Sequence, residues 1–282
     1  MTIRQAINMI RDAAIDIYGE REAFQIGRIM IMELGGYSST QLVVNIDDEC
    51  TIENLDWVAE QVASARPLQY IVGETEFCDL KFKVSEGVLI PRPETEELVM
   101  LIARGCKVYS HSLNIVDIGT GSGAIAVSLA KLIEGSEVWG VDISDDALAQ
   151  ARINGELNGV NVHFTKGDAL RGVENYLPDV KFDVVVSNPP YIPRSEGGAM
   201  RRNVMEYEPH LALFVEDGDP LIFYREIAKS ALKILTNCGK LYFEIHEGFA
   251  SEMVDMLQQL GFRDVVCHED INQKPRMICA QR

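Results

Sequence analysis

The chain has 282 residues, of which 47% are hydrophobic and 24% are charged, so it can form one large or two modest globular domains. The 43 Asp and Glu residues outnumber the 26 Lys and Arg residues and give a formal net charge of −17. This charge argues against bulk binding to DNA or RNA, because that binding depends on contacts between basic side chains and phosphates.

The cysteines, the histidines and the first residues exclude further classes of protein. The six cysteines form no CxxC pair and the five histidines have no metal-ligand spacing, so we expect reduced thiols and no metal site. Asp12 and Asp16 interrupt the first apolar stretch, which argues against a secretion or transit signal. No apolar run is long enough to cross a bilayer. We therefore expect a cytoplasmic protein without a membrane partner.

Residues 1–70 are predicted to form a helical domain. Apolar residues recur at helical spacing from Ile3 to Ile17 and again from Phe24 to Leu34, with a break at Gly19. Four arginines and eleven acidic residues up to position 65 make this part acidic. A solvated surface is the simpler interpretation, and a docking face for a basic partner is the alternative.

Residues 71–93 are predicted to be a β-hairpin connector. A pattern of short β segments begins at Arg66 and ends at Pro91-Arg92-Pro93, and Val88-Leu89-Ile90 is its last apolar run. The Pro-Arg-Pro segment is either a rigid entry into a helix over 94–107 or a place where Arg92 or Glu94 lines the mouth of a cleft.

Residues 94–282 are predicted to form an α/β domain in which strands alternate with helices. This alternation implies a largely parallel sheet with helices on both faces, and such sheets bind ligands at the carboxyl ends of their strands. The expected strands are 114–117, 137–142, 162–165, 182–187 and 240–245, with weaker ones at 264–267 and 276–280, and the expected helices are 124–133, 145–158, 220–235 and 250–260.

A glycine-rich turn follows the first of these strands, with the sequence Asp117-Ile118-Gly119-Thr120-Gly121-Ser122-Gly123. Glycines allow a ligand to approach the backbone, and the helix that follows presents free N–H groups. Asp142 ends the next strand, where a carboxylate can bind ribose hydroxyls. The ligand can be NAD, FAD or S-adenosylmethionine, and a purely structural turn is the further alternative. The acidic Asp117 would repel a pyrophosphate and suits a cationic ligand, so the turn resembles the first motif of S-adenosylmethionine-dependent methyltransferases.

Gly167-Asp168-Ala169 follows the third expected strand, at the position where these methyltransferases bind the edge of the adenine. There Asp168 would accept a hydrogen bond from the exocyclic amine. Some members carry an aromatic residue that stacks on the adenine at the position of Ala169. In this chain that contact is either lost or supplied by another residue.

Asn188-Pro189-Pro190-Tyr191, at the end of the fourth expected strand, is the most specific signal. It resembles the active-site motif of methyltransferases that act on planar nitrogens, namely adenine N6, cytosine N4 or the glutamine side-chain amide. Such a nitrogen is a poor nucleophile because its lone pair is delocalised. The Asn188 amide oxygen and the Pro189 carbonyl can accept both of its N–H groups and direct the lone pair at the sulfonium methyl. Tyr191 would pack on the flat face of the substrate.

Additional segments make the resemblance closer and link it to one family. They are similar to signature segments of the peptide chain release factor N5-glutamine methyltransferases, the PrmC/HemK family, and they are Arg66 to Gly73, Val88 to Glu96, Tyr207-Glu208-Pro209 and Phe223-Tyr224-Arg225. The match extends from Arg66 to Lys274-Pro275-Arg276, about three-quarters of the chain. The resemblance implies an α/β fold, with a seven-stranded Rossmann-like S-adenosylmethionine-dependent methyltransferase domain and an N-terminal helical domain that helps to bind the partner.

The resemblance also implies a reaction and a set of site residues. The chain would methylate the N5 nitrogen of the glutamine in the Gly-Gly-Gln motif of release factors. The cofactor residues would be Asp117, Ile118, Gly119, Thr120, Gly121, Asp142, Asp168, Ala169 and Asn188, and the catalytic residues Asn188, Pro189, Pro190 and Tyr191.

Two other functions and two structural questions stay open at this point. The first function is an N6-adenine methyltransferase on DNA or RNA, which should carry a basic groove, and the second is a binding module without catalysis. The glycine- and arginine-rich stretch 194–205 is a mobile lid, a partner-contacting loop or a disordered segment. The oligomeric state does not follow from the sequence, and we expect a monomer that binds no nucleic acid directly.

Overall fold

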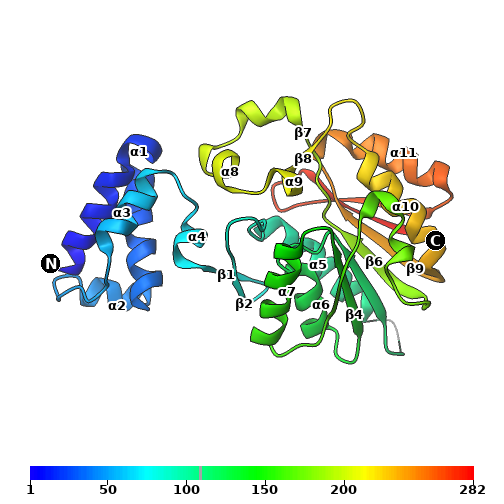
Figure 1. The fold of residues 1–282 in the computed structure, drawn as a ribbon, viewed down its shortest axis with the longest axis horizontal. Coiled ribbons are helices and arrows are strands. Elements are labelled where there is room, and N and C mark those ends of the chain that lie inside the picture. The colour runs from blue at the N-terminus through cyan, green and yellow to red at the C-terminus, as the bar shows by residue number, and fades with distance from the viewer. Residues whose placement is uncertain (108–109) are drawn as a thin grey trace. The chain divides into compact units, whose positions relative to one another are not determined.

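The computed structural model describes residues 1–107 and 110–282. Its contacts divide the chain into two compact units, whose helices and strands are drawn in Figure 1. The smaller unit comprises Met1–Glu74 and Arg201–Tyr207, and the larger unit comprises Thr75–Met200 and Glu208–Arg282. The three-part division at residues 70 and 93 stays a prediction.

The smaller unit is built from helices, as the apolar spacing predicts. Its first helix, α1 (Ile3–Gly35), begins with a capping box in which the Thr2 side chain accepts a hydrogen bond from the Gln5 N–H. Gly19 interrupts this helix with a φ of 74°, which confirms the predicted break. The other helices are α2 (Ser39–Val44), α3 (Leu55–Ala63), α4 (Leu68–Val72) and α8 (Arg202–Tyr207).

The prediction of short β segments over residues 66–93 is correct only in the middle of that range. Strands β1 (Glu74–Phe77) and β2 (Leu80–Lys83) form a two-stranded sheet. Residues 68–72 instead form helix α4, because Pro67 precedes the helix and Gly73, with a φ of 81°, ends it. Val88-Leu89-Ile90 is irregular rather than a strand, and its Val88 and Ile90 side chains are buried.

The larger unit is organised around a seven-stranded sheet in the order β10-β11-β9-β6-β3-β4-β5. All neighbouring pairs are parallel except the two that involve β11, which runs antiparallel to both β9 and β10. The strands are β3 (Asn114–Ile118), β4 (Glu137–Asp142), β5 (His163–Lys166), β6 (Phe182–Ser187), β9 (Leu235–Glu244), β10 (Arg263–Glu269) and β11 (Pro275–Gln281). All seven predicted strands are confirmed, although β9 begins five residues earlier than expected.

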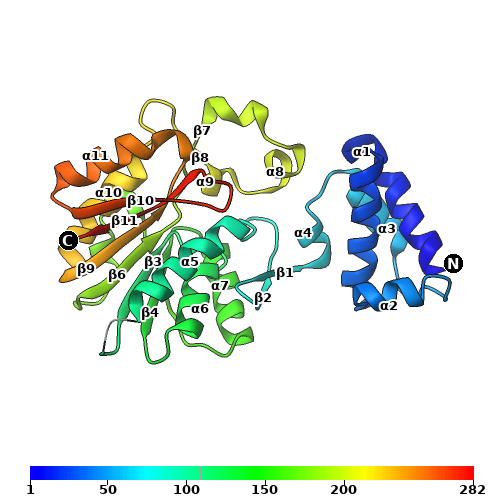
Figure 2. The same cartoon turned by 180° about the vertical axis from the view of Figure 1, so that it is seen from behind.

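Helices cover both faces of this sheet, and the rear view shows the same two layers (Figure 2). The helices that lie on one face are α5 (Pro93–Cys106), α6 (Ala124–Leu132) and α7 (Asp145–Leu157), and those on the other are α10 (Ile222–Ile234) and α11 (Ala250–Leu260). Shorter elements join them, namely η1 (Ala169–Arg171), η2 (Val173–Asn175), β7 (Ile192–Pro193), η3 (Arg194–Ala199), α9 (His210–Leu213), β8 (Phe214–Val215) and η4 (Glu247–Phe249).

The strand order places a switch point beside β3, at the centre of the sheet. The chain adds β4 and β5 on one side of β3 and then crosses to add β6 on the other side. All six residues of β6 are buried, as expected for a central strand covered on both faces. The loops after β3 and β6 therefore leave the sheet side by side, at the edge where such sheets bind ligands.

The stretch 194–205 is ordered into helical turns, η3 and the first residues of α8. In η3, Arg194 Nε lies 2.7 Å from Glu216 Oε1, and the Ser195 N–H and hydroxyl both donate to Asp217 Oδ1. The structure does not support the disordered alternative. All six cysteines are free thiols, as predicted. Within residues 1–107 and 110–282, no helix combines the length and apolarity needed to cross a membrane.

Candidate functional site

The glycine-rich loop after β3 exposes its backbone at the centre of the sheet. Gly119 and Gly121 have φ values of 75° and 55°, and a Cβ on either residue would meet no atom within 4 Å. The N–H groups of Gly119 and Thr120 donate to the Val141 carbonyl at 2.8 and 3.0 Å, which holds the loop against β4. The open side of the glycines therefore remains accessible to a ligand that approaches the backbone.

Asp117, at the end of β3, supports this loop from below and does not line the cleft. Its side chain is fully buried, and its Oδ2 accepts a hydrogen bond of 2.6 Å from the Thr120 hydroxyl. Its Oδ1 is buried without a hydrogen-bond partner among the described residues. Burial raises the pKa of Asp117 to about 7, and the hydroxyl of Thr120 opposes this shift. Asp117 thus binds the loop rather than offering a carboxylate to the cleft.

Asp142, at the end of β4, lies in the cleft wall and is partly exposed. Its Oδ2 accepts from the Gly121 N–H at 2.8 Å, and its Oδ1 accepts from the Ser144 N–H at 2.9 Å. Each carboxylate oxygen can accept a second hydrogen bond, so Asp142 can also bind two neighbouring hydroxyl groups. Burial raises the pKa of Asp142, and the backbone N–H donors oppose this shift.

Asp168 and Ala169 lie farther along the same wall, after β5. Asp168 caps η1 by accepting from the Leu170 N–H at 2.9 Å, and its other oxygen lies 3.2 Å from Arg171 Nε. Ala169 lines the cleft, and its position at the adenine stays a prediction. Phe223 of α10 lines the same cleft, and α10 packs against η1. Phe223 thus provides an aromatic ring in the same cleft as Ala169. The sequence did not indicate this role, because Phe223 lies about 50 residues after Ala169 in the chain.

These residues surround a cleft of about 270 Å³ at the carboxyl ends of the strands. Its wall comes from the loops after β3, β4, β5 and β6, from α10, and from the irregular segment before α5. Of the predicted site residues, the wall contains Ile118, Gly119, Thr120, Gly121, Asp142, Asp168, Ala169, Asn188, Pro189 and Pro190, and it does not contain Asp117 or Tyr191.

The loop after β6 brings Asn188 into this wall. The Ser187 hydroxyl donates to the Ile118 carbonyl at 2.6 Å, which ties the end of β6 to the end of β3. The Asn188 Nδ2 donates to Thr95 Oγ1 at 3.3 Å. The two prolines that follow have no backbone N–H. They therefore cannot donate hydrogen bonds to the carbonyl oxygens of this loop. Asn188 therefore presents a fixed amide beside the glycine-rich loop.

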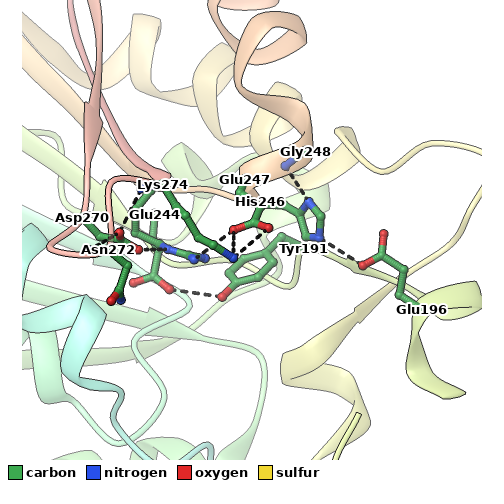
Figure 3. Close-up of polar contacts among 10 residues, drawn as sticks. Tyr191, Glu196, Glu244, His246, Glu247, Gly248, Asp270, Asn272 and Lys274 are labelled. Carbon is green, nitrogen blue, oxygen red and sulfur yellow. Dashed lines mark hydrogen bonds and ion pairs between the residues drawn. The ribbon is translucent and has the colours of Figure 1, made fainter. Parts of the chain in front are cut away.

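Tyr191 lies outside the lining of the cleft. Its hydroxyl donates to Glu244 Oε1 at 3.2 Å, and its ring meets that of His246 edge to face (Figure 3). Burial and the nearby Glu244 carboxylate raise the pKa of Tyr191. The predicted packing of Tyr191 on a flat substrate stays a prediction, and the observed contact anchors the far end of the Asn188–Tyr191 loop.

The segment before α5 provides the opposite lip of the cleft. Arg92 lines it, and Glu94 is not among the lining residues. Arg92 is held by Glu208, with its guanidinium 2.6 Å from Glu208 Oε1, and the Ile90 N–H donates to Glu208 Oε2 at 3.4 Å. The segment Tyr207-Glu208-Pro209 resembles the family in sequence, but the sequence does not indicate this role of Glu208, because Arg92 and Ile90 lie 116 and 118 positions away.

The donor set of the cleft fits S-adenosylmethionine. The glycine-rich loop leaves room for a ligand to contact its backbone. The remaining lone pairs of Asp142 suit the hydroxyl groups of a ribose, and the apolar surface of Ala169 and Phe223 suits an adenine. No cluster of His, Cys, Asp or Glu in the described ranges could hold a metal ion.

Comparison with known proteins places the site in a family context. Residues 110–277 match the model of a methyltransferase domain. The chain is 41% identical to the release factor glutamine methyltransferase of Flavobacterium psychrophilum over 99% of this chain and 98% of that protein. It is 39% identical to the protein of the same name from Bacteroides thetaiotaomicron, over 97% and 98% of the two chains. A solved methyltransferase structure from Pyrococcus furiosus shares the fold, with a TM-score of 0.51, 17% identity, and coverage of 72% of this chain and 88% of that one.

Proposed function

The chain belongs to the release factor glutamine methyltransferases, and from this premise we propose how its residues perform the reaction. The enzyme transfers a methyl group from S-adenosylmethionine to the side-chain amide nitrogen of a glutamine in a release factor. We propose the glutamine of the Gly-Gly-Gln motif as the target, on the basis of the family resemblance of the segments around Arg66, Pro91 and Glu208.

One observation carries the catalytic assignment: Asn188 lines the cleft together with the glycine-rich loop, and its Nδ2 donates to Thr95 Oγ1. Its oxygen is then the atom available to the substrate. The Asn188 Oδ1 and the Pro189 carbonyl accept the two N–H groups of the glutamine amide and hold its nitrogen in line for transfer. Cofactor binding supplies an electrophilic methyl group on a sulfonium sulfur.

Proton removal in this site needs no dedicated base. The amide nitrogen becomes strongly acidic as it gains the methyl group and positive charge, so its proton leaves to water. Among the described residues of the cleft wall, the ionisable side chains are Arg92, Asp142 and Asp168. Arg92 is paired with Glu208, and the two aspartates lie at the ends of β4 and β5, where we propose that the cofactor binds. The role of the protein is thus to hold the amide rather than to deprotonate it.

For the cofactor we propose the glycine-rich loop, Asp142, Asp168 and the apolar wall. Gly119 to Gly121 would hold the methionine part, Asp142 the ribose hydroxyls, and Asp168 the exocyclic amine of the adenine. Phe223 would contact the adenine, in place of the aromatic residue that some family members carry at the position of Ala169.

The acidic character of the chain disfavours the alternative, an N6-adenine methyltransferase. The net charge of the chain is −17. Among the described residues of the cleft wall the basic one is Arg92, and its charge is neutralised by Glu208. A duplex substrate would need unpaired cations along its phosphates. The names of the relatives favour glutamine as well.

We propose a monomer in the cytoplasm, with the N-terminal helical domain helping to bind the release factor. The six free thiols suit a reducing compartment.

The test is a transfer assay with labelled S-adenosylmethionine and three acceptors. These are a release factor, its variant with the Gly-Gly-Gln glutamine changed to alanine, and an adenine-containing duplex. Label on the unmodified release factor alone is the expected result. Label on the duplex would replace the proposal with the adenine enzyme, and cofactor binding without any transfer would favour the binding module.

A further inference from the structure

Three residues that are distant in the sequence form a continuous chain of hydrogen bonds that leads from the cleft wall, where Thr95 and Asn188 lie, to the buried Glu244. Thr95 lies in α5, Asn188 follows β6, and Glu244 ends β9. The Thr95 hydroxyl donates to Glu244 Oε2 at 2.6 Å, and Asn188 Nδ2 donates to Thr95 Oγ1 at 3.3 Å. Thr95 and Glu244 are 5% and 1% exposed, so water does not compete for these bonds.

Glu244 also receives a second hydroxyl, from the other end of the same loop. The Tyr191 hydroxyl donates to Glu244 Oε1 at 3.2 Å (Figure 3). One buried carboxylate therefore holds both ends of the Asn188–Tyr191 loop, directly at Tyr191 and through Thr95 at Asn188. The backbone of Glu244 is fixed as well, because its carbonyl accepts from the buried Tyr224 hydroxyl at 3.1 Å.

The direction of these bonds determines which end of the Asn188 amide faces the cleft. A carboxylate only accepts hydrogen bonds, so Thr95 must use its single hydroxyl proton on Glu244. Thr95 can then only accept from Asn188, and the group that it accepts from is the NH₂. The oxygen of the amide is left on the opposite side, away from Thr95. Without Glu244 the hydroxyl could rotate, donate to Asn188 Oδ1, and reverse the amide.

A nearby cation accompanies the buried carboxylate. Burial raises the pKa of Glu244, while the Thr95 hydroxyl, the positive charge of Arg276 and the Tyr191 hydroxyl oppose this shift. Arg276 is itself held in place, with its Nε 3.2 Å from Asp270 Oδ2. The two hydroxyl donors and the positive charge of Arg276 thus favour the ionised form of Glu244, which accepts hydrogen bonds.

We propose that Glu244 is a positioning residue, which acts through Thr95 to keep the Asn188 oxygen, and not its NH₂ group, facing the substrate. The inference deepens the proposed function and rests on the role of Asn188 given there. A reversed amide would set a donor against the N–H groups of the glutamine, and the nitrogen could not be held in line for transfer.

Thr95→Val is the main test, because it keeps the shape of the side chain and removes the hydroxyl between Glu244 and Asn188. We expect kcat to fall by about 30-fold or more, with the Kd for S-adenosylmethionine changed by less than about threefold. Thr95→Ser restores the hydroxyl and should bring kcat back to within about fivefold of the original enzyme. Glu244→Gln should also lower kcat, because a carboxamide offers one acceptor oxygen to two hydroxyl donors.

Two parallel variants separate positioning from folding and from failure of the proposed function. Ser230→Ala removes a buried hydroxyl that accepts from the Val173 N–H, outside the cleft wall, and should leave kcat unchanged. Asn188→Ala should abolish transfer. If Asn188→Ala is inactive while Thr95→Val keeps kcat within threefold, the positioning role is overturned and the proposed function stands. If Asn188→Ala is active, the positioning role and the proposed function are both overturned. If Thr95→Val loses cofactor affinity and kcat equally, only the positioning role is overturned.

Discussion

Asp117 and Asp142 are aspartates at the carboxyl ends of neighbouring parallel strands, but their surroundings give them different tasks. Asp142 keeps lone pairs directed at the cleft, whereas Asp117 is fully buried and binds the loop through Thr120. Both follow an apolar strand in the sequence, so the pattern alone does not distinguish them. The distinction comes from the loop that folds over Asp117.

The buried Asp117 should make the stability of the larger unit depend on pH. Its pKa is about 7 in the folded chain and near 3.8 when exposed, so its contribution to stability is full below about pH 4 and is lost as the pH rises through 7. Asp117→Asn removes this dependence. The free energy of unfolding of the variant relative to the original enzyme should rise by up to about 1.4 kcal/mol per pH unit across that window and level off above it.

Urea unfolding of both proteins at pH 5, 6, 7 and 8 measures this difference. A difference that stays constant over the four values would show that Asp117 keeps an ordinary pKa in the folded chain.

Asn188 should contribute to transfer and little to cofactor binding. Asn188→Ala removes the proposed acceptor for the glutamine N–H group and leaves the glycine-rich loop and Asp142 intact. We expect turnover to be abolished while the Kd for S-adenosylmethionine stays within about tenfold. Single-turnover kinetics and calorimetric titration of the cofactor give the two numbers, and equal losses in both would contradict the assigned role.

At the scale of elements, the loop between β3 and α6 works through backbone conformation. Gly119 adopts a φ of 75° and its missing Cβ faces open space in the cleft. An alanine there is disfavoured by about 1–2 kcal/mol through its backbone conformation and also places a methyl group where the ligand approaches. Gly119→Ala should therefore weaken cofactor binding.

Gly135 provides the matched control for this prediction. It has a φ of 77°, its added Cβ would meet no atom within 4 Å, and it is not among the residues of the cleft wall. Gly135→Ala should reduce the free energy of unfolding by a similar amount without changing the Kd for S-adenosylmethionine. Equal cofactor affinities of the two variants would show that the loop backbone does not contact the ligand.

The structure of elements with long periodic patterns can be predicted from their own sequence, whereas the structure of short segments depends on the residues that pack against them. The alternation from β3 to α11 is long enough to specify each element, and the central strand β6 is buried along its whole length. Val88-Leu89-Ile90 has strand composition but forms an irregular segment at the cleft, and its Val88 and Ile90 side chains are buried. Tertiary burial overrides local β preference in such a short run.

At the scale of the molecule, the two units have separate cores. One cluster of buried side chains, which includes Ile7, Ile10 and Val62, belongs to the smaller unit, and two clusters on either face of the sheet belong to the larger one. Each cluster of described buried residues lies within one unit. Cofactor binding, which involves the larger unit, should therefore stabilise that unit selectively.

Differential scanning calorimetry should show two transitions, of which S-adenosylmethionine raises one. At 100 times its Kd the cofactor adds about 2.7 kcal/mol to the stability of the unit that binds it. Ile10→Ala creates a cavity in the smaller unit and should lower the other transition, at a cost of about 2–5 kcal/mol. A single transition that responds to both changes would show that the units unfold together.

The sequence by itself determined the order of elements in the larger unit, and ten of the twelve residues that it predicted for the site lie in the cleft wall. Hydrophobic periodicity and turn residues are local properties, and the glycine-rich turn, Asp142 and the Asn188 loop each follow a recognisable strand. Because the carboxyl ends of parallel strands share one edge, strand order was enough to bring these residues together.

Only the tertiary structure decided what each residue of the site contacts. The burial of Asp117, the pairing of Arg92 with Glu208, and the hydrogen bonds from Thr95 to Glu244 join positions that no local pattern relates. Tyr191 shows the same limit, because no local pattern indicates that its hydroxyl donates to Glu244, 53 positions away. Hydrogen-bond partners depend on distance and direction in three dimensions, and a one-dimensional pattern contains neither.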